Sequence, residues 1–172
     1  MTEWLPTKQT ARGRLVLAAL EGFGGRGYQP VGVSELARSA NTTTGPLYHH
    51  FGSKLGLYQA VRRDVEQRII DRMSGALESQ PALAPALVVG FDYPYRAGYL
   101  RLAGEPHPDP GEDPIAALLT RQVGAPLGAM LTAAWRQALL ACADGAPPTE
   151  VRAALHAIAE SMGPGAVPSS QS

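Results

Sequence analysis

The strongest constraint on the fold is a pair of short helical segments separated by about three residues, around Asn41 to Thr43. Apolar side chains recur at helical spacing in both segments. In the first they are Val33, Leu36, Ala37 and Ala40, and in the second they are Leu47, Tyr48 and Phe51. The threonines at 42–44 can cap the second segment, and Gly52 ends it. This arrangement predicts a helix-turn-helix unit.

Helical patterns lie on both sides of this unit. Apolar side chains recur at helical spacing over about 10–26, which predicts a first helix. Glycine is a poor helix former, so we expect the end of that helix, with Gly22, Gly24 and Gly25, to fray. An apolar stripe that follows the unit predicts a long helix over about 53–77.

The rest of the chain is also predicted to be helical, with one loop. After the long helix the pattern is interrupted by prolines and glycines. Over 104–114 four prolines alternate with four acidic residues, which predicts a loop whose acidic side chains are solvated. Two further helices are expected at about 127–143 and 149–162, with Cys142 on a buried, unreactive face. No alternation of period two is visible, so the sequence predicts an all-α fold.

Charge and composition narrow the class of protein. The 172 residues carry no net formal charge, but residues 1–68 have nine Lys and Arg against five acidic residues, and the remainder has six against ten. A basic N-terminal part fits a domain that faces nucleic-acid phosphates, joined to a C-terminal part with a different function. The single cysteine suits a reducing compartment, and we expect the cytoplasm. No apolar run approaches a membrane span and no signal peptide is visible, so no membrane partner is expected.

The helix-turn-helix segment has a recognisable signature. Its residues are Val33, Ser34, Glu35, Leu36 and Ala37, followed by the run NTTTGPLYHHFGSK from Asn41 to Lys54. This segment resembles the signature of the TetR (tetracycline-repressor-like) family of bacterial regulators, and the resemblance covers about residues 10–65. Asn41 stands where the family commonly has glycine, and asparagine also tolerates a left-handed backbone.

The resemblance implies an all-helical homodimer in which separate domains bind DNA and the effector. Residues 1–52 would form the helix-turn-helix DNA-binding domain, linked by the helix at about 53–77 to a helical effector-binding and dimerisation domain at 78–163. Residues 164–172 are expected to be a disordered tail. The last two helices would pair across a two-fold axis and place half-sites of a palindromic operator roughly 34 Å apart, or a multiple of that. A small molecule would release the operator by a shift of the long helix.

A helix that enters the major groove needs small side chains at its leading end. Four residues satisfy this requirement: Thr43, Thr44, Gly45 and Pro46. No Arg or Lys lies between Arg38 and Lys54, so a basic side chain of the second helix cannot supply the common bidentate contact to guanine. We therefore expect readout through threonines, thymine methyl groups and DNA shape.

Other residues of the segment are assigned from the family motif. The resemblance implies that Tyr48, His49 and Lys54 contact phosphates, the last from the N-terminus of the long helix, which favours anions. His50, next to Phe51, is expected to pack inside the DNA-binding domain.

The C-terminal part of the chain gives a weaker indication of its function. Aromatic residues that could line a ligand pocket are Phe91, Tyr93, Tyr95, Tyr99 and Trp135, although core or dimer contacts explain them equally well. Of the four histidines two lie in the DNA-binding segment, and no metal-ligand spacing or phosphate-binding loop is visible. We therefore predict no catalytic residue, metal or cofactor.

The sequence as a whole predicts a DNA-binding transcriptional regulator, specifically a repressor that an unidentified small molecule releases. Two alternatives stay open. In one, the C-terminal part only dimerises or binds a protein partner, and in the other the chain is a helical enzyme with a chance motif.

Overall fold

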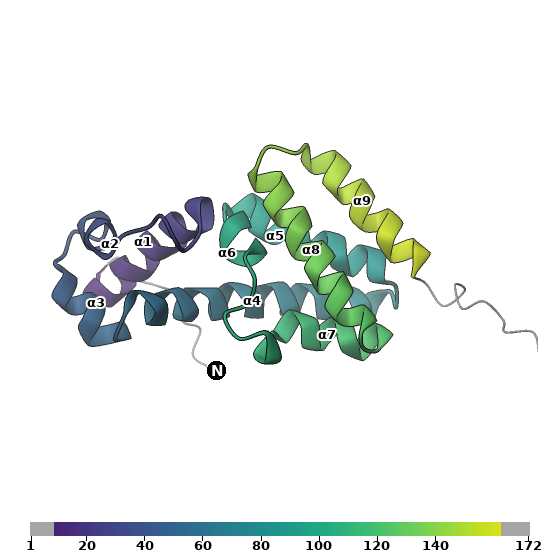
Figure 1. Ribbon diagram of the computed structural model, residues 1–172, viewed down its shortest axis with the longest axis horizontal. Helices are drawn as coiled ribbons and strands as arrows, with labels where there is room; N and C mark the ends of the chain where they lie inside the picture. The colour runs from purple at the N-terminus through teal and green to yellow at the C-terminus, as the bar shows by residue number, and fades with distance from the viewer. Residues whose placement is uncertain (1–8, 163–172) are drawn as a thin grey trace, which may run out of the picture.

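The computed structural model describes residues 9–162, so the predicted tail at 164–172 lies outside the described residues. Within 9–162 the chain forms α-helices, one 3-10 turn and connecting loops, with no strand, which confirms the all-α prediction (Figure 1). The elements are α1 (Ala11–Arg26), α2 (Val33–Ser39), α3 (Thr44–Phe51), α4 (Lys54–Ser79), α5 (Leu83–Ala97), α6 (Leu100–Gly104), η1 (Pro110–Glu112), α7 (Pro114–Val123), α8 (Leu127–Ala143) and α9 (Pro148–Ser161).

Helices α1–α3, here called the head, gather at one end of an elongated molecule (Figure 1). The Thr10 hydroxyl accepts a hydrogen bond from the Gly13 amide and caps α1. The expected fraying of α1 is wrong, because the helix continues through its glycines to Arg26. A Cβ at Gly24 would lie 2.6 Å from the carbonyl oxygen of Gly98, so the missing side chain lets α1 pack closely against the turn between α5 and α6.

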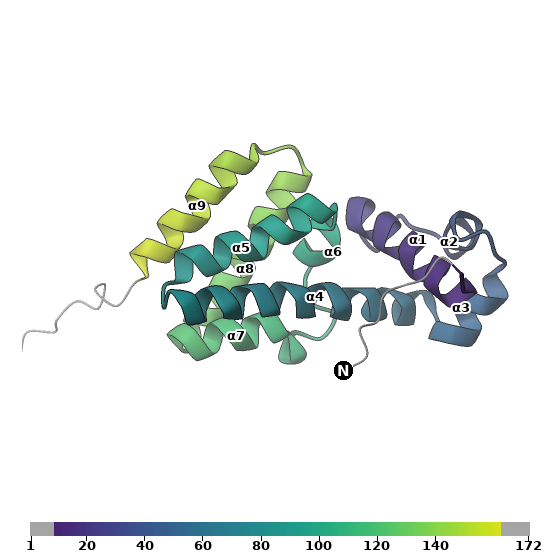
Figure 2. The ribbon, with the colours of Figure 1, turned by 180° about the vertical axis from the view of Figure 1, so that it is seen from behind.

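Helix α4 belongs to both parts of the molecule. Its 26 residues span about 39 Å, and it runs from beneath the head along the whole of the body, here helices α5–α9 (Figures 1 and 2). The Ser53 hydroxyl caps it by accepting the Gly56 amide at 2.9 Å. The apolar stripe predicted from the sequence is buried from Leu57 to Met73. The same helix therefore contributes to the packing of the head and of the body.

The body contains helices that the sequence did not predict. Helix α5 runs unbroken through Pro94, although this proline removes one backbone donor inside the helix. Helix α7 was assigned to no element, yet Asp113 caps it by accepting the amides of Ile115 and Ala116. The short α6 was also missed, whereas α8 and α9 agree with prediction to within one residue at every end.

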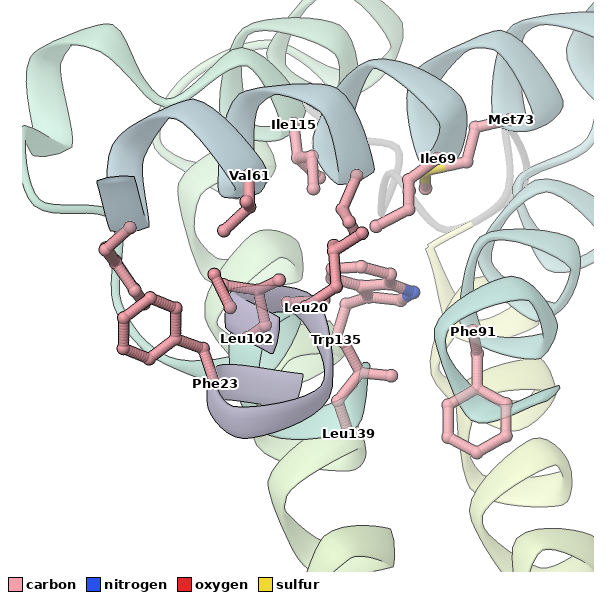
Figure 3. Packing of buried hydrophobic residues seen from close by; sticks show 14 of the residues in the cluster. Leu20, Phe23, Val61, Ile69, Met73, Phe91, Leu102, Ile115, Trp135 and Leu139 are labelled. Atoms are coloured by element: carbon pink, nitrogen blue, oxygen red, sulfur yellow. The ribbon is translucent and has the colours of Figure 1, made fainter. Parts of the chain in front are cut away.

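One apolar core joins the head to the body. Leu20 and Phe23 of α1 lie in the same packed layer as Val61 of α4, Leu102 of α6 and Trp135 of α8 (Figure 3). The head is thus packed on the body as well as connected to it through α4. Among residues 9–162, no helix combines the length and apolar character that crossing a membrane requires.

Candidate nucleic-acid interface

The turn between α2 and α3 is built by a left-handed residue. Asn41 has a φ of 48°, as expected from its place in the motif. Its amide donates to the carbonyl of Arg38 at 3.0 Å, and the amide of Thr42 donates to that of Ala37 at 2.9 Å. These two bonds form a Schellman ending of α2, which satisfies carbonyls at the helix terminus and turns the chain sharply. The turn thereby fixes the direction in which α3 leaves.

Helix α3 is anchored by one residue and exposed along most of its surface. Leu47 is fully buried in the core of the head. The residues predicted to face DNA bases or phosphates are exposed at Thr43, Gly45, Tyr48 and His49 and partly buried at Thr44 and Pro46. Tyr48 is 53% exposed, which is high for a large aromatic side chain. The geometry therefore presents a slim leading end with aromatic and imidazole side chains behind it.

His50 does not pack inside the head as expected, because it is exposed. Leu47 and Phe51, four residues apart, define the face of α3 that packs inward, and His50 lies about 100° around the helix from Phe51. Its ring instead meets that of His49 edge to face, with 5.0 Å between centroids. Two imidazoles therefore stand together on the exposed side of α3.

Lys54 lies at the N-terminus of α4, beside the turn that follows α1. Its Nζ is 3.3 Å from the carbonyl oxygen of Gln29 and 4.1 Å from the ring centroid of Tyr28. The amide end of α4 adds positive potential at the same place. A cation at a helix N-terminus suits an anionic partner such as a phosphate.

Two further basic residues of the head were missed from the sequence. Nε of Arg14 donates to the carbonyl of Ala40 at 2.9 Å, directly before the turn. The guanidinium of Arg12 lies 5.5 Å from the ring centroid of Phe51. Both arginines belong to the first turn of α1, so two positive charges lie next to the helix-turn-helix unit although α3 itself has no Lys or Arg. The basic excess of the N-terminal part was the available signal.

A buried arginine joins α4 to the loop at 105–113. Arg62 is 1% exposed and pairs with Glu66 at 2.9 Å, one turn along α4. It also donates to the Tyr58 hydroxyl at 2.7 Å and to the carbonyls of Pro106 and Glu105 at 3.1 and 2.6 Å. The loop is thereby held on α4 through its backbone.

A second buried arginine completes the same cluster from α8. Nη2 of Arg136 lies 2.9 Å from both Glu66 and Asp113, and the guanidinium also donates to the carbonyls of Ala103 and Glu105. The loop acids at 105 and 113 were expected to be solvated, and for these two the expectation is wrong. Asp113 is buried because it caps α7 and pairs with Arg136.

The predicted ligand residues lie in three different surroundings. Trp135 is fully buried, with its indole N–H donating to the carbonyl of Leu87 at 3.1 Å. Phe91 is also buried and stacks on the partly exposed Tyr95, with 5.8 Å between ring centroids. Tyr99 lies apart from these, against Tyr93, with 6.2 Å between their ring centroids.

Two cavities flank the loop at 105–113, and His107 lines both. One, of about 370 Å³, lies between the loop and the polar face of α4. The other, of about 400 Å³, lies between the loop, α7 and α8 and has a mainly apolar lining that includes Ala116, Ala129, Ala133 and Leu140. The predicted aromatic residues do not line either cavity.

Residues 15–61 match the model of bacterial regulatory proteins of the tetR family. The helix-turn-helix part of the chain therefore matches the TetR family. The match runs from within α1 to the first part of α4 and so includes the whole helix-turn-helix unit.

Curated relatives of this chain are similar to it over less than half of their own length. The transcriptional activator FasR of Mycolicibacterium smegmatis is 36% identical over 48% of this chain and 39% of FasR. The transcriptional regulatory protein RaaS of Mycobacterium tuberculosis is 39% identical over 41% of this chain and 32% of RaaS. The transcriptional regulator BetI of Escherichia coli is 31% identical over 41% of this chain and 36% of BetI. These names are those of regulators and not of enzymes, in agreement with the non-enzymatic prediction.

Among solved structures, a TetR-family regulator of Streptomyces coelicolor has a TM-score of 0.49 and 15% sequence identity. The similarity covers 88% of this chain and 93% of that one.

Proposed function

We propose that this protein is a dimeric transcriptional repressor of the cytoplasm that binds a palindromic operator through α3 and is released by a small molecule. The observation that carries the DNA-binding part is the exposed, slim end of α3, held on the buried Leu47 within the segment that matches the family model. A helix with such an end can bring its backbone close to base edges in the major groove.

In this proposal the residues of the interface have separate roles. Those at the leading end of α3 face the bases: Thr43, Thr44, Gly45 and Pro46. Tyr48, His49 and Lys54 contact phosphates, which position the protein without reading sequence. The present partners of Lys54 are one long hydrogen bond to a carbonyl and an aromatic face, both of which a phosphate can replace.

Helices α8 and α9 supply the proposed dimer interface. The outer surface of α9 is rich in small side chains, since Ala153, Ala154 and Ala157 are all exposed in the single chain. Met130 on α8 is 60% exposed. Small residues allow two helices to approach closely, and an exposed methionine gains from burial. A two-fold arrangement would place two copies of α3 on successive major grooves, roughly 34 Å apart.

The cavities beside the loop at 105–113 support the effector part of the proposal. Each has a volume within the range of small-molecule sites. The predicted residues Phe91, Tyr95, Tyr99 and Trp135 stay candidates for a separate ligand site. Tyr95 is the most exposed of these four side chains. A bound molecule would release DNA by displacing α4, which spans head and body.

The test is selection of duplexes from a random pool by the full-length protein, followed by affinity measurement and determination of the molar mass in solution. We expect enrichment of a palindrome and a dimeric mass, and loss of affinity when an effector from a metabolite panel binds. Failure to retain any duplex at low ionic strength would overturn DNA binding. A panel in which no compound changes affinity would favour a body that only dimerises or binds a protein partner.

A further inference from the structure

The carboxylate of Glu105, at the end of α6, binds the head directly. Both of its oxygens accept the backbone amide of Tyr28, at 3.0 and 3.2 Å. Oε2 also accepts the hydroxyl of Tyr58 at 2.8 Å. Tyr28 lies in the connection between α1 and α2, and Tyr58 lies on α4. One carboxylate of the body therefore binds both the connection between α1 and α2 in the head and the first part of α4.

The backbone of Glu105 is held in place by two buried arginines. Its backbone carbonyl accepts Nη2 of the buried Arg62 at 2.6 Å and Nη1 of the buried Arg136 at 3.4 Å. Burial raises the pKa of Tyr58 well above its usual value, which keeps the phenol protonated as a donor. Hydrogen bonds to an ionised acceptor are among the stronger ones in proteins. The hydrogen bond from the amide of Tyr28 is therefore accepted by a residue whose backbone is fixed by two buried arginines.

The bound residue of the head also supports a predicted DNA contact. The ring of Tyr28 lies under the ammonium of Lys54, 4.1 Å away, and packs edge to face on Tyr58, with 4.9 Å between centroids. A displacement of Tyr28 would therefore move the surroundings of Lys54. On the same side, Gly24 places α1 in close contact with the backbone of Gly98.

Given the DNA-binding function proposed above, we propose that Glu105 is a positioning residue for operator recognition: it fixes the head on the body and so sets the angle and spacing at which α3 is presented. A dimer reads two half-sites at once, so its preference for one spacing requires heads that do not pivot. The bond to Tyr28 restrains the head at a point that α4 alone does not restrain.

The experiment compares wild type with Glu105→Ala and with Glu105→Gln, which keeps one acceptor oxygen and serves where the alanine variant does not fold. Glu112→Ala, an exposed acid of the same loop, is the matched control. The DNA probes are the palindrome selected by wild type, the same palindrome with two base pairs inserted at its centre, and a random duplex. Amide hydrogen exchange of Tyr28 is measured on the DNA-free protein.

We expect exchange at Tyr28 to accelerate roughly 10- to 100-fold in Glu105→Ala, by the usual strength of a hydrogen bond to a charged group, while core amides of α4 and α8 keep their rates. Wild type and Glu112→Ala should discriminate strongly between the two palindromes, and the Glu105 variants should bind both within about threefold, with unchanged affinity for random duplex. A merely structural role would lower the affinity for every probe alike.

Unchanged exchange at Tyr28, or preserved spacing preference in a folded Glu105 variant, would overturn the role of Glu105 and leave the proposed function intact. Wild type that binds no duplex would instead overturn the proposed function itself.

Discussion

Two adjacent glycines of α1 offer a direct measure of how tightly the head is packed on the body. At Gly24 a Cβ would lie 2.6 Å from the carbonyl oxygen of Gly98, whereas ordinary contacts begin at 3.4 Å. The two backbones would have to separate by about 0.8 Å, because neither can rotate away as a side chain can. At Gly25 a Cβ would meet nothing within 4 Å.

The expected effects follow from these distances. Both Gly24→Ala and Gly25→Ala gain helix propensity, up to about 1 kcal/mol and less near the end of a helix. The difference between the two free energies of unfolding therefore isolates the steric cost, which for overpacking is about 1–3 kcal/mol. We expect Gly24→Ala to be less stable than Gly25→Ala by this amount, equivalent to roughly 2–12 °C in Tm for a chain of this size.

The assay is urea unfolding followed by circular dichroism at 222 nm, at one protein concentration for all variants because dimerisation would shift the midpoint. Gly25→Ala serves as the matched control, since it makes the same chemical change one residue away. If Gly24→Ala proved as stable as Gly25→Ala, the close packing of α1 on the turn at Gly98 would be refuted.

Other substitutions test the interface and the buried cluster. Lys54→Ala should weaken binding to specific and random duplexes alike and lower the salt dependence of the binding constant by about one unit, as measured by titration at several salt concentrations; a selective effect would contradict a phosphate contact. Substitution of Thr43 or Thr44 by valine or serine should change the bases selected from random DNA, and an unchanged preference would refute their readout. Arg136→Ala should cost about 3–5 kcal/mol in urea unfolding because it leaves buried carboxylates without their partner, and a loss below about 1 kcal/mol would show that the cluster is not desolvated. Cys142 is only half-buried, not fully buried as expected, and desolvation raises the pKa of its thiol, so alkylation by iodoacetamide at pH 8 should be slower in the folded protein than in urea; equal rates would contradict this shift.

The head was predictable because its structure depends on neighbours in sequence. The turn at Asn41 and the buried Leu47 follow from residues within one or two helical turns of them. The same local reasoning misplaced His50, since a short helix with apolar residues at several positions does not define its inward face sharply. Helix α7 could also have been found, because Asp113 and Pro114 at its start and Gly124 at its end are ordinary capping residues. The density of prolines before it obscured that signal.

The buried polar cluster could not be predicted in the same way. The bonds of Glu105 reach residues 77 and 47 positions away in the chain, and Arg136 reaches Glu66 across 70 positions. No local pattern distinguishes an acid that finds such a partner from one that stays in solvent. The spacing of Tyr58, Arg62 and Glu66 along one side of the apolar stripe of α4 was a partial signal, since it places two charges next to the core.

The packing of α1 against the body limits how far this head can be treated as a transplantable module. A chimaera that joined residues 1–52 to the body of another regulator would keep Gly24 and Tyr28 but lose Gly98 and Glu105. The graft would then be hinged only at the start of α4. To exchange DNA specificity between relatives, a chimaera therefore has to include the residues on both sides of this contact between α1 and the body. The alternative is to replace only the surface residues of α3.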